Sequence, residues 1–308
     1  HAVQIPDSAY ISIMNSIVRI EVENGKGTGF FTKCKIKNKL VFTLFTNYHV
    51  IPKYLVNSKE TIKIIYGNKI NETRKYIKLD ENQRFIKCFP QPKDVTVIEI
   101  LKSDNIPEDK YLSPDMNYKN EGFNNYSNCQ FYLAGYPHVD DTYIDYQGER
   151  HISSGRITKV FNNFEFEHTL DTRSGSSGSP ICLINNRRVI GIHKAGDKTT
   201  HINIGTFLGI ILDQLENAKE TIDVIIKTIE NCTTKFNVNP TDPLCILNDK
   251  IKNFLKTKNI DVDEHFTFRF LYAGRTFVCG SNKTFQEIIE DYDEEDMEMC
   301  ICLHPDYH

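Results

Sequence analysis

One serine in the 308-residue sequence stands in a context suited to nucleophilic chemistry. Ser177 lies in residues 171–180, DTRSGSSGSP, with Gly175 and Gly178 on either side. Glycines let the backbone turn sharply, so that N–H groups can converge beside the serine hydroxyl. A serine that attacks a carbonyl creates an oxyanion, which preorganised amide donors stabilise. We therefore predict Ser177 as a nucleophile, with the amides of Gly175 and Ser177 as its oxyanion hole.

The base and the carboxylate that such a serine needs occur upstream. Residues 40–46, LVFTLFT, have the composition of a β-strand and lead to His49. Asp94 stands at the head of a second apolar strand, VTVIEI at 95–100. The imidazole would take the serine proton, and the carboxylate would hold the tautomer of the imidazole. The order His49, Asp94, Ser177 predicts a catalytic triad, whereas the Gly/Ser segment alone would fit a turn equally well.

Short motifs around these residues resemble those of trypsin-like (chymotrypsin-fold) serine proteases. They are GTGFF at 27–31, TNYHV at 46–50, DVTVIEI at 94–100, AGYP at 134–137, GSSGSP at 175–180 and VIGIH at 189–193. The resemblance covers about the first two thirds of the chain and is greatest to glutamyl endopeptidases. It implies a catalytic domain over residues 1–219, with two packed six-stranded β-barrels near 12–103 and 125–207. We expect a closing helix at 208–219 and an unpatterned segment over residues 1–10.

The resemblance also assigns the S1 pocket, which binds the substrate side chain before the scissile bond (P1). Thr172, five residues before the nucleophile, and His193 would line it. A hydroxyl and an imidazole can both donate to oxygen, so we predict glutamate or glutamine at P1. If His193 titrates near 6.5, the preference for glutamate should grow as the pH falls. Two alternatives stay open: Asp171 could select Lys or Arg at P1, and His193 could be an ordinary buried residue.

Residues 220–304 resemble a ubiquitin-like domain with an α+β (β-grasp) fold. Alternating strands at 222–226 and 234–238 predict a hairpin, and Asp242-Pro243 predicts a helix start. The segments NPTD at 239–242 and RFLYAG at 269–274 strengthen the resemblance. The sequence ends without the Gly-Gly that conjugation needs, so we expect a non-covalent role in regulating the protease or recruiting its substrates. Leu271 matches the apolar centre of a partner-binding patch, although a lone leucine in a strand is more often part of the core.

Charge separates the two predicted domains. Residues 220–308 hold nine Lys and Arg against seventeen Asp and Glu, a net of −8, so the whole-chain value of −4 leaves +4 for residues 1–219. We expect an intramolecular contact between the acidic domain and the protease, and protein or peptide substrates. No basic stripe is present, which argues against nucleic acid as a partner. No apolar run is long enough for a transmembrane helix, which argues against a membrane.

Nine cysteines without paired spacing predict reduced thiols and a cytoplasmic (or nuclear) location. We expect no metal, because Cys300 and Cys302 lack a second pair of ligands nearby, and no cofactor. We interpret the remaining histidines considered, His138, His151, His168 and His201, as surface or hydrogen-bonded residues. Ser176 stands where secreted zymogens of this fold carry an aspartate, so activation by a freed N-terminus is not expected. An intracellular serine endopeptidase and a catalytically idle protease-fold scaffold are the two function classes left; an intact triad favours the enzyme.

Overall fold

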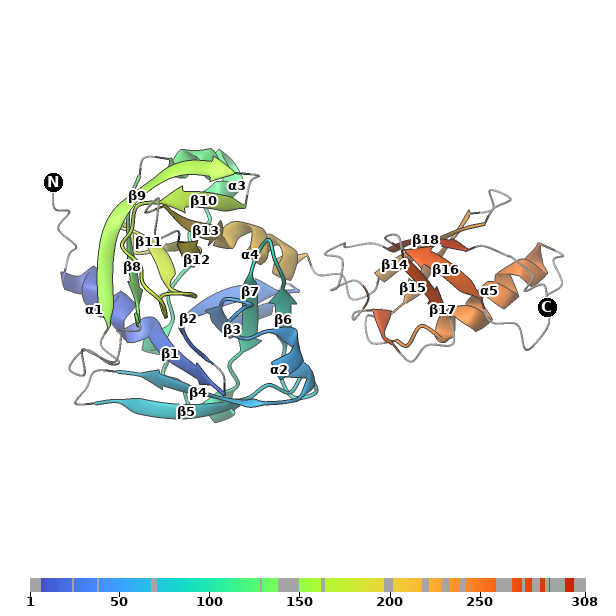
Figure 1. Ribbon diagram of the computed structural model, residues 1–308, viewed down its shortest axis with the longest axis horizontal. Helices are drawn as coiled ribbons and strands as arrows, with labels where there is room; N and C mark the ends of the chain where they lie inside the picture. The colour runs from blue at the N-terminus through green and yellow to red at the C-terminus, as the bar shows by residue number, and fades with distance from the viewer. Residues whose placement is uncertain are drawn as a thin grey trace. The chain divides into compact units, whose positions relative to one another are not determined.

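The computed structural model divides the chain into two compact units, His1–Ala218 and Lys219–His308 (Figure 1). The residues that the structure describes are 7–23, 25–37, 39–67, 71–127, 129–137, 150–161, 164–196, 202–217, 222–228, 233–238, 242–258, 268–272, 275–278, 283–285, 288 and 297–301.

The first half of the first unit is a seven-stranded antiparallel sheet. Its strands follow the order β5-β4-β1-β2-β3-β7-β6. They are β1 (Ile17–Val22), β2 (Gly25–Ile36), β3 (Lys39–Thr46), β4 (Thr61–Tyr66), β5 (Thr73–Lys78), β6 (Ile86–Phe89) and β7 (Val95–Glu99). The predicted closed six-stranded barrel near 12–103 is therefore an open, curled sheet: within the described residues, no pairing joins β5 to β6. One reason lies in β5, where Arg74, Lys75 and Lys78 suit a solvated edge.

The second half of the first unit is a closed six-stranded barrel. Its order is β10-β13-β12-β11-β8-β9. The strands are β8 (Gln130–Gly135), β9 (His151–Phe161), β10 (Glu165–His168), β11 (Pro180–Leu183), β12 (Val189–Gly196) and β13 (Asn203–Phe207). This confirms the barrel predicted near 125–207. Phe131, Phe166 and Phe207 are fully buried and fill its interior.

Short helices flank these strands. They are α1 (Asp7–Ser16), α2 (Lys53–Asn57), α3 (Tyr118–Glu121), α4 (Leu208–Glu216) and the 3₁₀ turns η1 (Lys102–Asp104), η2 (Glu108–Lys110) and η3 (Phe123–Tyr126). The expectation of an unpatterned lead-in over residues 1–10 is wrong, because α1 begins at Asp7 and buries Ile13 and Met14. The closing helix is confirmed but ends at Glu216, before the predicted residue 219.

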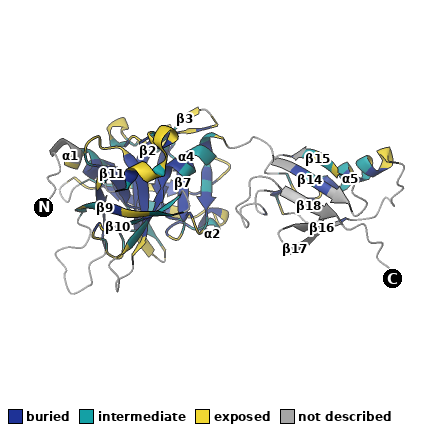
Figure 2. Cartoon of the chain, turned by 90° about the horizontal axis from the view of Figure 1, so that it is seen from above, coloured by how far each residue is buried: buried dark blue, intermediate teal, exposed yellow. Residues whose placement is uncertain are grey.

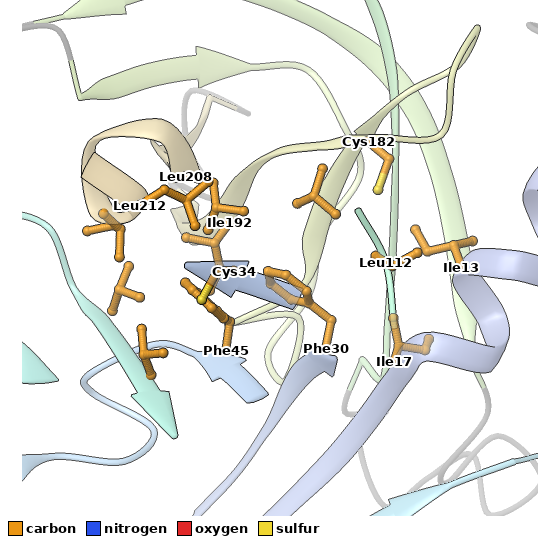
Figure 3. Packing of buried hydrophobic residues seen from close by; sticks show 14 of the residues in the cluster. Ile13, Ile17, Phe30, Cys34, Phe45, Leu112, Cys182, Ile192, Leu208 and Leu212 are labelled. Carbon is orange, nitrogen blue, oxygen red and sulfur yellow. The ribbon is translucent and has the colours of Figure 1, made fainter. Parts of the chain in front are cut away.

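One hydrophobic cluster joins the open sheet to the barrel (Figure 3). Phe30 and Phe45 reach it from β2 and β3, and Ile192 reaches it from β12. Helices α1 and α4 contribute Ile13, Leu208 and Leu212. Figure 2 shows buried residues concentrated along the strands of this unit. Burying each large apolar side chain contributes about 1.5–3 kcal/mol, so this cluster packs the sheet firmly against the barrel. Loops from the sheet and from the barrel therefore keep fixed positions relative to each other.

The described residues of the second unit form a five-stranded sheet and one long helix. The strands are β14 (Ile222–Thr228), β15 (Thr233–Val238), β16 (Arg269–Tyr272), β17 (Arg275–Val278) and β18 (Met297–Ile301), in the order β15-β14-β18-β16-β17. β14 and β18 are parallel, and the other pairs are antiparallel. Helix α5 (Ile246–Thr257) buries Leu247, Ile251 and Leu255.

The start of α5 differs from the prediction at Asp242-Pro243. Pro243 forms an antiparallel bridge with Thr284, and the Leu244 N–H donates to Lys283 O at 2.9 Å. These residues pair with a distant segment, so the helix begins only at Ile246. No helix among the described residues of the chain has the length and apolarity that crossing a membrane requires.

Candidate active site

Strand register brings His49 and Asp94 together at the same end of two neighbouring strands of the open sheet. β3 and β7 are antiparallel, and Thr46 pairs with Thr96. His49 follows the end of β3 by three residues and Asp94 directly precedes β7. The chain turns after β3, where the N–H groups of Val50 and Ile51 donate to Asn47 O. The two predicted residues therefore meet although 45 residues separate them.

The Asp94 carboxylate holds His49 at two points. Asp94 Oδ2 lies 2.7 Å from His49 Nδ1, and Asp94 Oδ1 accepts from the His49 backbone N–H at 2.9 Å. Asn47 Nδ2 donates to Asp94 O at 2.9 Å. The Asp94 side chain is 1% exposed, whereas that of His49 is 45% exposed. A buried carboxylate on Nδ1 leaves Nε2 of the partly exposed ring as the nitrogen that can accept a proton.

Asp94 takes a left-handed backbone conformation, with φ of 57°. Its N–H donates to Pro90 O at 2.9 Å. Aspartate is among the few residues that tolerate this conformation as a single residue. The tight turn 90–94 therefore aims the carboxylate back toward the segment after β3.

The barrel holds this turn from the other side. Thr206 Oγ1, on β13, donates to Lys93 O at 2.7 Å. Lys194 Nζ, on β12, donates to Pro92 O and also pairs with Glu165 of β10. Both contacts cross from the barrel to the turn that carries Asp94. The position of the Asp94 carboxylate thus depends on both halves of the unit.

The predicted nucleophile loop folds on itself. The Ser176 N–H donates to Arg173 O at 2.9 Å, and the Arg173 N–H donates to Ser176 Oγ at 3.2 Å. Ser176 is buried, whereas Ser177 is partly exposed. This reciprocal pair closes the turn without an acidic residue at position 176.

Gly178 permits the close approach of this loop to the open sheet. Its φ is 89°, and a Cβ there would lie 2.0 Å from Thr28 O and 2.7 Å from Thr46 Oγ1. Only glycine fits such a position. Thr46 is the last residue of β3, so the loop that carries Ser177 packs against the strand end from which His49 follows.

Thr28 on β2 ties the loop down. Its N–H donates to Ser177 O at 2.8 Å, and its Oγ1 donates to Gly175 O at 2.8 Å. The same Oγ1 accepts from the Tyr136 N–H at 2.9 Å. Thr28 is fully buried, so these bonds fix the 175–176 and 177–178 peptide groups.

The amides of Gly175 and Ser177 have no acceptor among the described residues, whereas the Ser176 N–H between them is engaged. The φ of Gly175 is 87°. The Ser177 hydroxyl makes no hydrogen bond within the described part of the chain, including to His49. Catalytic hydrogen bonds are often long without substrate and shorten when it binds.

The predicted recognition residue His193 is buried beside a second histidine. His193 is 3% exposed, and its Nδ1 lies 3.2 Å from Nε2 of His168, which is 1% exposed. Antiparallel bonds connect His193 to the nucleophile loop: Gly178 N–H donates to His193 O, and His193 N–H donates to Ser179 O. Burial, with a smaller contribution from His49, lowers the pKa of His193 to about 3. The expectation that His193 titrates near 6.5 is therefore wrong.

Thr172 is partly exposed, and its hydroxyl forms a hydrogen bond with a side chain of β13. Thr172 Oγ1 lies 2.6 Å from Asn203 Oδ1, and Asn203 Nδ2 donates to Leu170 O at 2.8 Å. Asp171, the alternative specificity residue, is exposed, and its N–H donates to Ser153 Oγ at 2.7 Å.

Four residues of this region were not singled out from the sequence: Thr28, Lys194, Asn203 and Thr206. Thr28 lies inside the GTGFF motif, so its position was a usable signal. His168 is one of the predicted hydrogen-bonded histidines, and its partner is His193. His151 is exposed, whereas His138 and His201 lie outside the described residues.

Five described cysteines form no disulfide: Cys34, Cys88, Cys129, Cys182 and Cys245. In the part of the chain that the structure describes, no three His, Cys, Asp or Glu side chains group as a metal site would require. Cys302, one of the pair considered for zinc, lies outside that part.

Comparison with known proteins places the chain in a family. A family model described as a trypsin-like peptidase domain matches residues 27–192, more than half of the chain. The fold and this match define the class of protein as a serine endopeptidase with a chymotrypsin-like fold. The chain belongs to the trypsin-like peptidase family.

Three of the similar solved structures are proteases. A Glu endopeptidase in complex with MPD is 18% identical, with 70% of this chain and 96% of that chain covered and a TM-score of 0.48. A serine endoprotease from Yersinia pestis is 14% identical, with 89% and 97% covered and a TM-score of 0.48. The tobacco etch virus protease bound to its product is 13% identical, with 77% and 86% covered and a TM-score of 0.44. No curated protein matches the chain.

Proposed function

We propose that His49, Asp94 and Ser177 are the catalytic triad of this endopeptidase. The observation that carries the proposal is the double hydrogen bond of Asp94 to His49, on the ring nitrogen and on the backbone. It leaves His49 Nε2 as the base that removes the Ser177 proton as the hydroxyl attacks the substrate carbonyl. The imidazolium then donates this proton to the leaving amine. Asp94 stabilises the imidazolium while it exists.

The Gly175 and Ser177 amides are the proposed oxyanion donors. They have no acceptor in the described part of the chain, which supports this role, because an N–H without a partner beside the nucleophile is available to the developing oxyanion. The bonds from Thr28 to Gly175 O and Ser177 O preorganise the loop before substrate arrives. Removing one oxyanion donor typically lowers turnover about 100- to 1,000-fold, so the arrangement of these amides is a main contributor to rate.

Substrate recognition is proposed to use Thr172 and His193 and to select glutamate or glutamine at P1. Support comes from His193, which β12 places next to the nucleophile loop. Asp171 is a weaker candidate for selecting Lys or Arg, because its exposed carboxylate is hydrated and would gain little from pairing with a cation. The substrates are accordingly proteins or peptides with an accessible Glu or Gln.

A serine-directed fluorophosphonate probe tests the triad. The wild-type chain should be labelled, and Ser177→Ala should not, because the reacting oxygen is gone. Ser174→Ala is the matched control: Ser174 is exposed in the same loop and should leave labelling unchanged. His49→Ala should lower peptide hydrolysis by a factor on the order of a million, as loss of a triad member does in a related mechanism. Labelling of the Ser177→Ala variant would disprove the assignment.

We further propose that the second unit is a ubiquitin-like domain. The order β15-β14-β18-β16-β17, with a parallel central pair and one helix after the first hairpin, is that of a β-grasp sheet. A partner-binding role for Leu271 stays a prediction, since its side-chain surroundings lie outside what the structure describes. Nuclear Overhauser contacts between β14 and β18 in the full chain test the fold. Val224 should contact Met297, and Thr228 should contact Ile301; antiparallel contacts would refute it.

A further inference from the structure

Strand β5 ends the open sheet with a free edge. It pairs with β4 on one side, and no strand among the described residues pairs with it on the other (Figure 1). The register with β4 is continuous over all six residues of β5, without a bulge, and the strand contains no proline. Bulges, prolines and charged side chains commonly protect sheet edges, and β5 has only the charged side chains. The edge of β5 can therefore accept another strand.

The pairing with β4 determines which backbone groups of β5 point outward. The N–H of Leu79, directly after β5, donates to Glu60 O at 2.8 Å. Hydrogen-bonded and non-hydrogen-bonded positions alternate along an antiparallel pair, so every second residue counted back from Leu79 also bonds to β4. The residues in between direct their N–H and C=O groups away from the sheet, and they are Arg74, Tyr76 and Lys78. No bond to these outward groups is present among the described residues.

The same three residues expose their side chains on one face of the sheet. Arg74 and Lys78 are exposed, and Tyr76 is 66% exposed. Arg74 pairs with Glu72 at 2.7 Å, and its side chain is still 62% exposed in this pair. By contrast, β6 at the other end of the sheet buries three of its four residues. Free backbone groups and accessible side chains thus coincide on β5.

Positive charge without a partner lies along this edge. Lys75 and Lys78 form no ion pair within the described residues. Asp80, two residues after Lys78, pairs with Lys59 at 3.2 Å. Farther onto the sheet, on β1, Glu21 pairs with its two basic neighbours at 3.1 and 2.8 Å. The uncompensated charge is therefore concentrated on the edge strand and not on the face beside it.

We propose that β5 binds an extended acidic segment of a partner protein, which adds an eighth strand to the seven-stranded sheet. The backbone of the segment bonds to the outward N–H and C=O groups of β5, as in other cases of strand addition. Its acidic side chains, at alternate positions, lie beside Arg74 and Lys78, and opposite charges on neighbouring strands stabilise their pairing. A nucleic acid supplies negative charge but no alternating N–H and C=O groups, so a peptide fits this edge better.

This surface is separate from the proposed triad. Three strands, β4, β1 and β2, lie between β5 and β3, the strand that leads to His49. Binding at β5 therefore leaves the nucleophile loop accessible, and the proposal does not depend on the assignment of the triad.

The test uses the full chain with Ser177→Ala, which removes the proposed nucleophile, and a peptide of about ten residues that alternates Asp and Val. Hydrogen exchange is measured residue by residue with and without the peptide. The amides of Arg74, Tyr76 and Lys78 should exchange more slowly with the peptide bound, because their N–H groups gain acceptors. The amides between them already bond to β4 and should change little. Attraction between charges alone would not produce this alternation.

Two controls separate charge from backbone pairing. Lys78→Glu should weaken binding of the Asp-Val peptide roughly 3- to 10-fold, because an attraction becomes a repulsion. Lys39→Glu makes the same change at an exposed lysine at the start of β3 and should leave binding unchanged. The same peptide with N-methyl groups on its Asp amides keeps its charge but cannot donate to β5, so it should not bind.

A uniform change in exchange along β5, or no change, would overturn the proposal, as would equal binding of the N-methylated peptide. Tighter binding of an oligo(dT) of similar length, weakened by Lys78→Glu, would assign the edge to nucleic acid and also overturn it. The exchange pattern needs no substitution at the edge, so it decides the matter even if Lys78→Glu does not fold. Fluorophosphonate labelling of chains that retain Ser177 tests the triad separately.

Discussion

Mild acid should destabilise the first unit, because two neutral histidines are buried in it. Burial lowers the folded-state pKa of His193 to about 3 and holds that of His168 well below 6.5. In the unfolded chain each imidazole titrates near 6.5 and takes up a proton that the folded state does not bind. The free energy of unfolding is therefore highest above pH 6.5 and falls as the pH drops toward the folded-state pKa. Between pH 8 and 5.5 the loss is on the order of 1 kcal/mol for each histidine, or roughly 2–3 kcal/mol for the pair.

The choice of pH 5.5 as the lower limit separates the histidines from the carboxylates. The fold lowers the pKa values of Glu21, Asp80 and Glu216 from 4.5, 3.8 and 4.5, so their loss of charge destabilises the fold only in stronger acid. Between pH 8 and 5.5, protonation of unfolded-state histidines is the main linked event.

Amide hydrogen exchange in the full chain measures this effect. The slowest amides of β12, corrected for the intrinsic pH dependence of exchange, report the opening free energy of the barrel. His168→Gln should halve the pH dependence, since glutamine takes up no proton in either state. His151→Gln is the matched control, because His151 is exposed and hydrated in both states. The reasoning would be refuted if the opening free energy of the wild type did not change from pH 8 to 5.5. It would also be refuted if the opening free energy of His168→Gln changed with pH as steeply as that of the wild type.

Two further predictions concern the geometry of the site. Gly178→Ala should abolish fluorophosphonate labelling and strongly lower thermal stability, because the new Cβ would lie 2.0 Å from Thr28 O. Gly122→Ala is the control, because Gly122 has a φ of 72° but open space around it. It should lower the free energy of unfolding by only about 1 kcal/mol, measured in a thermal scan. Lys194→Met should lower kcat about 10- to 100-fold with little effect on KM, because the turn at Pro92 loses one of its two contacts with the barrel. Adding Glu165→Gln should recover stability but not rate. An unchanged kcat in Lys194→Met would show that the turn holds Asp94 without the Lys194 contact.

The sequence predicted most of the strands around the site, but not helix α1 or the hydrogen-bond partners of the site residues. Strands such as 40–46 and 95–100 were recognisable because their apolar pattern is local. Helix α1 was missed, because DSAYISIMNS is poor in strong helix formers and the helix depends on burial of Ile13 and Met14.

The hydrogen-bond network at the recognition residues could not be predicted for a related reason. Asn203 is 31 residues from Thr172, and His168 is 25 residues from His193. Neither partner belongs to a motif, so nothing in the sequence connects it to its neighbour. The pairs form only when β10, β12 and β13 come together in the barrel. Residue types thus led to the proposed recognition residues, whereas their hydrogen-bond partners required the fold.

The open sheet of the first unit has a consequence for solubility during folding. An unclosed sheet leaves edge strands with free backbone groups, which can pair with another molecule and seed aggregation. In β5, three of the six residues are basic, Arg74, Lys75 and Lys78, and Arg74 and Lys78 are exposed. Pairing of two such edges in register would bring like charges together, which disfavours it. These basic residues should therefore protect the chain against edge-to-edge self-association. Neutral substitutions there should make the protein aggregate at concentrations where the wild type does not.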